Sequence, residues 1–423
     1  AREEYRVWKT LKRALKYKQF QIQSMDPYFM LTPSVLEPEP VPINAKVILI
    51  GSKDEYDNLY CQDDEFGLIF KIKADFDDVT DRTDASILKY ASFIKKVCSD
   101  ENLKAFDKTG VAAVIEQAVR IAGRQDKLTT QFSEIANLLR EANYWAQQDN
   151  SPYVKEEHVE KALQEKWERL SLRAQKIQED IREGTTLINT EGLAVGQVNG
   201  LTIPEMADFT FGRPARITGR TSMGRSGIIN IEREADLSGK MHTKGIHILN
   251  GYFRGKYAQD KSLNMSATIC FEQFYRIDGD SASSAEVYAL ISSLTELPIR
   301  QDLAVTGSVN QMGEIQPIGA VNEKIEGFYD VCRIRGLTGT QGVLIPYLNL
   351  KDLQLRKDVI QSVEKGEFHI YAIKTIDEGI EILTGVAAGE KQEDGTYKEG
   401  TVNFLVNKRL REMNKGDKGS DGD

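Results

Sequence analysis

The sequence predicts an α+β fold, in which a short mixed segment and a helical region precede a larger domain of strands and helices. Apolar residues first recur at helical spacing, over residues 103–146 and 155–182. Short β-prone runs separated by glycines follow, over residues 185–256. An apolar run then leads through a tight turn into another helix, over residues 267–294. We therefore divide the chain into domains at residues 1–95, 96–184 and 185–405, with a charged, disordered tail at 406–423.

Composition and charge exclude several functions. The 423 residues suffice for two or three domains, and the hydrophobic (40%) and charged (28%) fractions are those of a globular protein. The net charge of −9 argues against a dedicated nucleic-acid binder, which needs a basic face. No run is long and apolar enough to span a membrane, and no signal peptide is found at the start. We expect neither nucleic acid nor membrane as a partner.

The cysteines and histidines predict no metal site and no cofactor. Four cysteines lack close pairs and metal-ligand spacing: Cys61, Cys98, Cys270 and Cys332. Free thiols fit a reducing cytoplasm, where we expect the protein to act. The histidines are dispersed, and we interpret His242 and His247, in a predicted strand region, as packing residues rather than zinc ligands.

The first domain combines a helix, a connector and a strand. Residues 1–23 are basic with a spaced apolar face, which fits a nucleic-acid-binding helix or, as we favour, a solvated charged face. Residues 36–42 carry three prolines and cannot be helical. Residues 46–51 form an apolar run that ends in glycine, which predicts a strand.

The sequence lacks a nucleotide-binding phosphate loop. Such a loop reads Gly-x-x-x-x-Gly-Lys-Ser/Thr at a strand-to-helix turn. The nearest match, residues 219–226, has Arg225 in the lysine position and lies between β-type segments. We interpret it as a hairpin loop and expect no ATP hydrolysis by this chain.

A strand–turn–helix motif around Ser281 is the candidate nucleophile site. Gly279 can adopt the backbone angles of the turn, and Asp280 is the predicted N-cap. Ser281 would then lie in the first helical turn, among free amides that can hold an oxyanion. A serine that merely starts a helix explains the pattern too, and Ser283 or Ser284 would be the nucleophile if the turn lies elsewhere.

A second motif supplies a candidate base. Residues 319–322 lead into a predicted helix, which Asn322 would cap and whose first turn would hold Lys324. A neutral lysine amine can activate a serine, and burial or a helix N-terminus lowers a lysine pKa. Glu323 and Glu326 should face away from the amine, because residues one and two apart point in different directions on a helix. The alternative is a solvated surface lysine.

Together, the two motifs resemble the serine–lysine pair of Lon-type proteases. Residues 278–283, Asp-Gly-Asp-Ser-Ala-Ser, are similar to the B-type, archaeal-like branch, whereas the A-type has a proline just before the serine. Residues 317–324 match the lysine motif, and the interval of 43 residues agrees with the family. Residues 343–346 resemble the strand that follows the lysine helix. The resemblance runs from about Gly184 to Leu405.

A weaker resemblance covers the earlier residues. Residues 36–76 and 103–170 resemble the later part of the ATPase module, including its helical lid, in bacterial Lon-like proteins of this branch. The resemblance implies that the chain begins beyond the phosphate loop and the metal-binding acidic strand. Arg120 and Arg124 would be relics of a nucleotide-sensing arginine or, as we favour, surface salt-bridge residues.

The resemblance implies an endopeptidase that acts through an acyl-enzyme. Ser281 would be the nucleophile and Lys324 the base, while Thr306 occupies the position of a threonine that orients the lysine. Asp280 would either cap the helix or pair with Lys324 in a closed, inactive site. Substrates would be unfolded polypeptides or peptides, cleaved in a homo-hexameric ring. The alternatives are a non-catalytic ring-forming or chaperone-like module, and the protease half of a longer ATP-dependent Lon.

Overall fold

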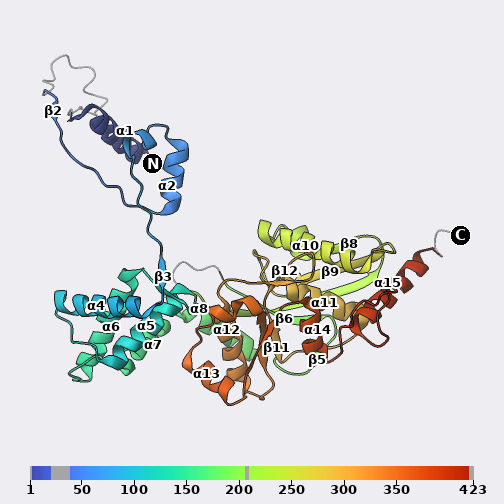
Figure 1. Cartoon of the computed structure of the whole chain (residues 1–423). Helices are drawn as coiled ribbons and strands as arrows, with labels where there is room; N and C mark the ends of the chain where they lie inside the picture. Colours follow the sequence, from blue (N-terminus) through green and yellow to red (C-terminus); the bar gives the residue numbers. More distant parts are fainter. Residues whose placement is uncertain (1, 21–38, 205–208, 419–423) are drawn as a thin grey trace. The chain divides into compact units, whose positions relative to one another are not determined.

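The computed structural model describes residues 2–20, 39–204 and 209–418, and it divides the chain into two compact units (Figure 1). The first unit is Ala1–Asp77 and the second is Asp78–Asp423. Helices and strands alternate through both, which confirms the predicted mixture of helix and sheet.

The first unit is built on ion pairs between a basic helix and an acidic turn. Its elements are α1 (Arg2–Tyr17), β1 (Gln19–Phe20), β2 (Val41–Pro42), α2 (Lys53–Gln62) and α3 (Phe66–Ile69). On α1, Trp8 Nε1 donates a 2.7 Å hydrogen bond to Asp63, and Lys12 contacts Asp63 and Glu65 at 2.8 and 3.1 Å. Lys12 of α1 thus pairs with carboxylates of its own chain at side-chain exposures of only 14% for Lys12 and 15% for Asp63, so this part of the basic face is packed rather than solvated as we had favoured.

The strand predicted at residues 46–51 is wrong. The structure assigns no strand to residues 43–52, and the side chains of Ile48 and Ile50 are 85% and 96% exposed. A strand needs a hydrogen-bonded neighbour, and no strand of the described residues pairs with this run. The apolar composition of residues 46–51 was therefore insufficient to predict a strand.

The second unit begins with a helical region. It contains β3 (Val79–Asp81), α4 (Asp84–Asp100), α5 (Lys108–Ala122), β4 (Lys127–Thr129), α6 (Phe132–Gln148), α7 (Glu156–Leu170) and α8 (Leu172–Glu183). The apolar faces of α4 to α7 share one core. Left-handed glycines end α5 and α8, at Gly123 and Gly184. Helix α4 extends across residue 95, and the predicted domain boundaries stay predictions.

A seven-stranded mixed sheet forms the centre of the remaining residues. Its strand order is β15-β14-β11-β6-β7-β9-β8. The bounds, in that order, are His369–Ile373, Gly342–Pro346, Leu303–Val305, Gln197–Thr202, Arg213–Met223, Met265–Phe271 and Gly227–Asn230. β7 runs antiparallel to β6 and β9, whereas β6, β11, β14 and β15 pair in parallel. Two-stranded pairs also form, between β5 (Leu193–Ala194) and β10 (Ile299–Arg300) and between β12 (Ser308–Val309) and β13 (Ile315–Gln316).

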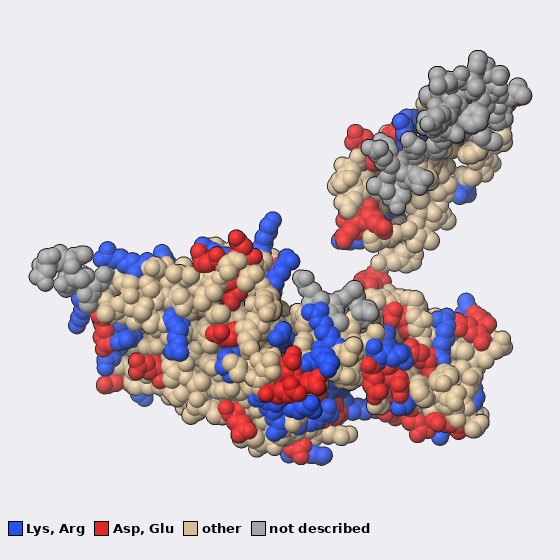
Figure 2. Space-filling view, turned by 180° about the vertical axis from the view of Figure 1, so that it is seen from behind, with Lys and Arg blue, Asp and Glu red and all other residues tan. Residues whose placement is uncertain are grey.

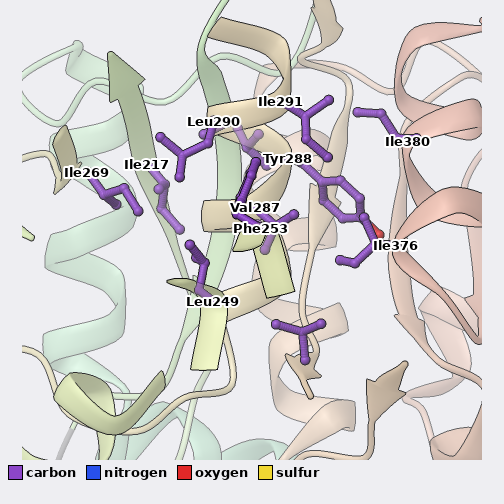
Figure 3. Close-up of a cluster of buried hydrophobic side chains, with 14 of the residues drawn as sticks. Ile217, Leu249, Phe253, Ile269, Val287, Tyr288, Leu290, Ile291, Ile376 and Ile380 are labelled. Atoms are coloured by element: carbon purple, nitrogen blue, oxygen red, sulfur yellow. The ribbon is translucent and has the colours of Figure 1, made fainter. Parts of the chain in front are cut away.

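Helices cover both faces of this sheet. One face packs against α10 (Lys240–Tyr257), α11 (Ser283–Thr295), α14 (Ile376–Thr384) and α15 (Val402–Lys418), in the core that Figure 3 shows around Tyr288 and Phe253. The other face packs against α12 (Val321–Arg335) and α13 (Lys357–Glu364). Short elements α9 (Ile231–Glu234) and η2 (Tyr347–Asp352) complete the domain. The two faces matter because α11, on one side, follows the Ser281 turn and α12, on the other, contains Lys324.

The predicted disordered tail is wrong for most of its length. Residues 402–418 form α15, and four of its side chains belong to the main core: Val402, Val406, Leu410 and Met413. Their spacing of three or four residues gives the helix an apolar stripe, and burying that stripe outweighs the charged composition. Residues 419–423 lie outside the described residues.

The surface shows no separation of charge on the face drawn in Figure 2. There, basic and acidic side chains are interspersed over the described residues. Among the helices of the described residues, none has the length and apolarity to cross a membrane.

His242 lies in helix α10, so the strand predicted around it is wrong. The ring is buried and packs edge-on against Phe271, at 5.3 Å between centroids and 83° between planes, as a packing residue should. Its Nε2 lies 3.6 Å from an oxygen of Glu286, on α11. Glu286 is only 1% exposed, and neither of its oxygens accepts a hydrogen bond from the described residues. Burial, with the nearby charges of Glu232 and Asp280, raises the pKa of Glu286 well above 4.5.

We expect Glu286→Gln to flatten the pH dependence of stability. Because the folded-state pKa exceeds the unfolded value, the stability linked to this group is complete below about pH 4.5 and is lost as pH rises towards the folded pKa. Glutamine does not titrate, so the free energy of unfolding should fall less between about pH 5 and pH 8. Urea unfolding across this range measures it. Glu364→Gln, which changes an exposed carboxyl, should keep the wild-type slope, and a wild-type slope in Glu286→Gln would contradict the prediction.

Candidate active site

The turn that carries Ser281 connects β9 to α11. Gly279 has a φ of +86°, the left-handed conformation expected of it. Helix α11 begins at Ser283 after an N-cap at Ala282, with no side-chain cap. Asp280 is therefore not the N-cap, and Ser281 precedes the helix instead of lying in its first turn. Both predictions are wrong because a neighbouring segment holds the turn outside the helix.

That neighbouring segment is residues 306–309, which follow β11 and include β12. The Ser281 carbonyl accepts hydrogen bonds from the amide of Gly307 at 2.7 Å and the hydroxyl of Thr306 at 3.1 Å. Ser284 Oγ donates to the Gly307 carbonyl at 2.8 Å, and Ser283 Oγ accepts from Val309 N at 3.0 Å. The hydroxyls of Ser283 and Ser284 are thus engaged by backbone groups, whereas that of Ser281 meets a side chain.

Lys324 approaches this turn from helix α12. The helix begins at Val321 after Ala320, which has a φ of +54° and caps without a side-chain bond. Asn322 is therefore not the cap. Its amide side chain instead donates to Asp352 O at 2.9 Å and accepts from Gln354 N at 2.7 Å. Lys324 does lie in the first turn, as predicted from the motif.

The structure brings Ser281, Lys324 and Thr306 together. Lys324 Nζ lies 2.7 Å from Ser281 Oγ and 3.2 Å from Thr306 Oγ1. Lys324 is 2% exposed and Thr306 is fully buried, while Ser281 is partly accessible. A partly accessible hydroxyl thus contacts an amine that water does not surround, which is the arrangement a serine nucleophile and its base require.

The environment of Lys324 raises the fraction of neutral amine above that of a solvated lysine. Burial lowers the pKa of Lys324 to about 8, and the negative charge of Asp280 opposes that shift. Roughly a tenth of the molecules would therefore hold a neutral amine at pH 7. Glu323 and Glu326 point towards Arg120 instead, at 3.7 and 2.7 Å, so they face away from the amine as predicted.

Asp280 neither caps the helix nor forms an ion pair with Lys324 in this structure. Its Oδ2 accepts a 3.1 Å hydrogen bond from the Oγ of Ser308, which belongs to the segment that holds the turn. Asp280 therefore acts on the lysine through space, as a nearby charge that favours the protonated amine.

Sequence reasoning missed a backbone contact beside Lys324. A Cβ added to Gly212, just before β7, would lie 2.1 Å from the carbonyl oxygen of Glu323 and 2.6 Å from the Cα of Lys324. A Cβ added to Gly327, about one turn further along α12, would likewise lie 2.1 Å from the carbonyl oxygen of Gly212. A glycine that precedes a strand gives no local signal of such contact, because its neighbour lies more than 100 residues away.

We expect Gly212→Ala to lower peptide cleavage by at least about tenfold, because the added methyl must displace α12 at Lys324 and small misplacements of catalytic groups are costly. Initial rates on a fluorogenic peptide measure it, with circular dichroism as a check on folding. Gly319→Ala is the matched control, since its Cβ would meet nothing within 4 Å. Equal rates in the two variants would show that the contact is unimportant.

Three family models match this chain. The LonB-like AAA domain matches residues 2–77, and the AAA+ ATPase LID domain of archaeal LonB matches residues 105–169. The C-terminal proteolytic domain of Lon protease (S16) matches residues 275–385, a range that includes Ser281, Thr306 and Lys324. The fold and these matches define the class as a Lon-type protease domain with a LonB-like lid.

Curated relatives support the same class of protein. A Lon protease homolog of Escherichia coli K12 is 32% identical over 381 residues, which are 89% of this chain and 64% of the relative. A Lon protease homolog of Haemophilus influenzae is 30% identical over 96% of this chain and 67% of the relative. The archaeal Lon protease of Archaeoglobus fulgidus is 30% identical over 68% of this chain and 44% of its own length. The chain belongs to the Lon protease family, in its B-type, archaeal-like branch. It spans about two thirds or less of the length of these curated relatives.

Proposed function

We propose that this chain is a serine endopeptidase that hydrolyses peptides and unfolded polypeptides through Ser281 and Lys324. The observation that carries the proposal is the 2.7 Å contact between Ser281 Oγ and the buried amine of Lys324. A solvated surface lysine, the alternative left open by the sequence, would not be 2% exposed. Membership of the Lon protease family supports protease activity.

In the proposed reaction, neutral Lys324 accepts the Ser281 proton as Oγ attacks the scissile carbonyl. The tetrahedral intermediate collapses when the C–N bond breaks and the lysine passes its proton to the leaving amine. Water then attacks the acyl-enzyme, losing a proton to Lys324, and the serine leaves with that proton. The lysine returns to its neutral form after each half-reaction, so no other base is needed.

The backbone around Ser281 would stabilise the oxyanion. The amides of Ser283 and Ser284 are occupied by the carbonyls of Asp280 and Gly307. Within the described residues, the amides of Ser281 and Ala282 have no acceptor, so they are free to bind a developing negative charge. Thr306 would orient the base, because its hydroxyl lies 3.2 Å from Lys324 Nζ and is itself anchored to the Ser281 carbonyl.

The proposal includes conditions that follow from the family resemblance. We place the reaction in the cytoplasm, within a homo-hexameric ring, with no cofactor and no ATP hydrolysis by this chain. The absence of a Gly-x-x-x-x-Gly-Lys-Ser/Thr motif from the 423 residues supports the last point. A second candidate is the protease part of a longer ATP-dependent Lon, which is favoured by the coverage of only 64% of the Escherichia coli relative.

Incubation of the pure chain with casein, with and without ATP and Mg²⁺, tests the proposal. We expect ATP-independent release of casein fragments. Failure to cleave either casein or short peptides would overturn the endopeptidase assignment and favour a non-catalytic, ring-forming or chaperone-like module. Cleavage that requires ATP, accompanied by ATP turnover, would contradict independence from ATP. Sedimentation equilibrium of the same sample tests the hexamer.

A further inference from the structure

Helix α12 carries the proposed base on one face and a row of buried polar side chains on another. Asn322, Glu326 and Asp330 follow each other at intervals of four residues, and all three are buried. Four-residue spacing aligns side chains along a helix, so these three form a single row. The hydrogen bonds and ion pairs made by this row fix the position of helix α12, and therefore the position of Lys324.

Residues 351–357, here called the clamp segment, hold the row from the protease side. Asn322 bonds to the backbone of Asp352 and Gln354, as described above. Glu326 Oε1 accepts a 2.9 Å hydrogen bond from the amide of Arg356. The Arg356 guanidinium forms two bonds to Asp330, at 2.9 and 2.5 Å. Every member of the row is thus bonded to the clamp segment.

Arg120 holds the middle of the row from the helical region. From α5, its two terminal nitrogens each lie 2.7 Å from an oxygen of Glu326, and Nη1 also donates to the carbonyl of Gln354 at 3.0 Å. The Arg120 and Glu326 side chains are 24% and 8% exposed. Arg120 thus forms a salt bridge as predicted, but with a largely buried carboxylate instead of on the surface, whereas Arg124 forms a surface bridge with Asp126, at exposures of 43% and 60%.

Further contacts join the helical region to the clamp segment. Gln125 bonds to the carbonyls of Lys351 and Leu353, at 2.9 Å through its amide nitrogen and 2.8 Å through its side chain. Lys357 pairs with Glu156 and Glu160 of α7. The helical region thus reaches α12 directly through Arg120 and, at the far end of α12, through Ile181 of α8, whose carbonyl accepts a 2.7 Å hydrogen bond from Arg335. Arg120 is the side chain of the helical region that, among the described residues, bonds both to α12 near Lys324 and to the clamp segment.

We propose that Arg120 is a positioning residue for Lys324, so that docking of the helical region sets the geometry of the serine–lysine pair. The inference rests on the proposed function. A bidentate arginine–carboxylate pair fixes both distance and orientation, which a single hydrogen bond cannot. Without Arg120, the Glu326 carboxylate keeps one hydrogen bond, from the amide of Arg356. Because a buried carboxylate without a charged partner is costly, α12 shifts so that the carboxylate reaches water. Lys324, two residues before Glu326, moves with it.

Steady-state kinetics on a fluorogenic peptide test the inference. Arg120→Ala should lower kcat by about tenfold or more and leave KM within about twofold, because the substrate-binding surface is unchanged and only the base is misplaced. Arg120→Lys should recover part of the rate, since it keeps the charge but loses the bidentate geometry. Arg124→Ala, four residues along the same chain, is the matched control and should match wild type.

A double-mutant cycle separates positioning from general destabilisation. If the two residues act as a pair, Arg120→Ala/Glu326→Ala should be no slower than Glu326→Ala alone, whereas independent effects would multiply. The rate at which a fluorophosphonate labels Ser281 should fall in parallel with kcat, at a temperature where circular dichroism shows each variant folded. Wild-type kcat in Arg120→Ala, or multiplicative effects, would overturn this inference alone. An inactive wild-type chain would overturn the proposed function with it.

Discussion

Ser281→Ala is expected to abolish peptide cleavage, with a loss on the order of 10⁴-fold or more, while the chain stays folded. Alanine removes the oxygen that would form the acyl-enzyme. The other hydroxyl that contacts Lys324, that of Thr306, is fully buried and donates to the Ser281 carbonyl, so it cannot replace the serine. The Ser281 side chain is partly accessible and its hydroxyl bonds only to the lysine among described residues, so its loss should cost little stability. Cleavage rates and thermal unfolding of the two proteins measure both claims.

Neighbouring serines provide the controls. Ser283→Ala and Ser284→Ala should retain measurable cleavage, because their hydroxyls support the backbone of residues 307–309 rather than the reaction. Full activity in Ser281→Ala with complete loss in Ser283→Ala would move the nucleophile to Ser283. A peptide boronate should inhibit the wild-type chain, since boron bound to a serine mimics the tetrahedral intermediate.

Lys324→Arg is expected to be as inactive as Lys324→Ala, although arginine keeps the positive charge. An arginine remains protonated at any usable pH and cannot accept the proton of Ser281. If the lysine instead served as a cation that stabilises the oxyanion, arginine would retain part of the rate. Substantial activity in Lys324→Arg would therefore overturn the base assignment and leave Ser281 as nucleophile.

The pH profile makes the same distinction in the wild-type chain. With burial lowering its pKa to about 8, Lys324 gains its neutral, basic form as pH rises through that value. The rate kcat/KM should accordingly increase with pH and level off above about 8 to 9. A rate that instead falls as the lysine loses its proton would indicate an electrostatic role. Peptide cleavage measured between about pH 6 and pH 10 decides the question.

Local signals were enough to predict the residues that the structure brings together at the candidate site. The turn at Gly279 and the helix that contains Lys324 are both encoded within a few residues, and the motif interval linked them. The predicted helix caps were wrong for the opposite reason. Asp280 and Asn322 have side chains that often cap helices, but these side chains form hydrogen bonds with Ser308 and with the backbone of Gln354 instead. Those partners are some 30 residues away, and no local rule includes them.

Contacts between residues far apart in the chain could not be predicted from the sequence. Arg120 and Glu326 are 206 residues apart, and neither carries any sign of its partner. The strand expected at residues 46–51 illustrates the same point, since apolar composition predicts a strand but cannot supply its neighbour. Conversely, the apolar stripe of α15 was present at Val402, Val406 and Leu410, and charge composition alone obscured it.

The position of β11 has a consequence for the order of folding. This strand delivers Thr306 to the Ser281 turn, and it is hydrogen-bonded between β6, from well before it in the chain, and β14, from well after. Such contacts close long loops and form late, after the helices. Ser281 and Lys324 therefore meet only when the sheet is complete. Under the proposed function, newly made copies that are still partly unfolded would lack an assembled serine–lysine pair, so chains at that stage would not cleave one another.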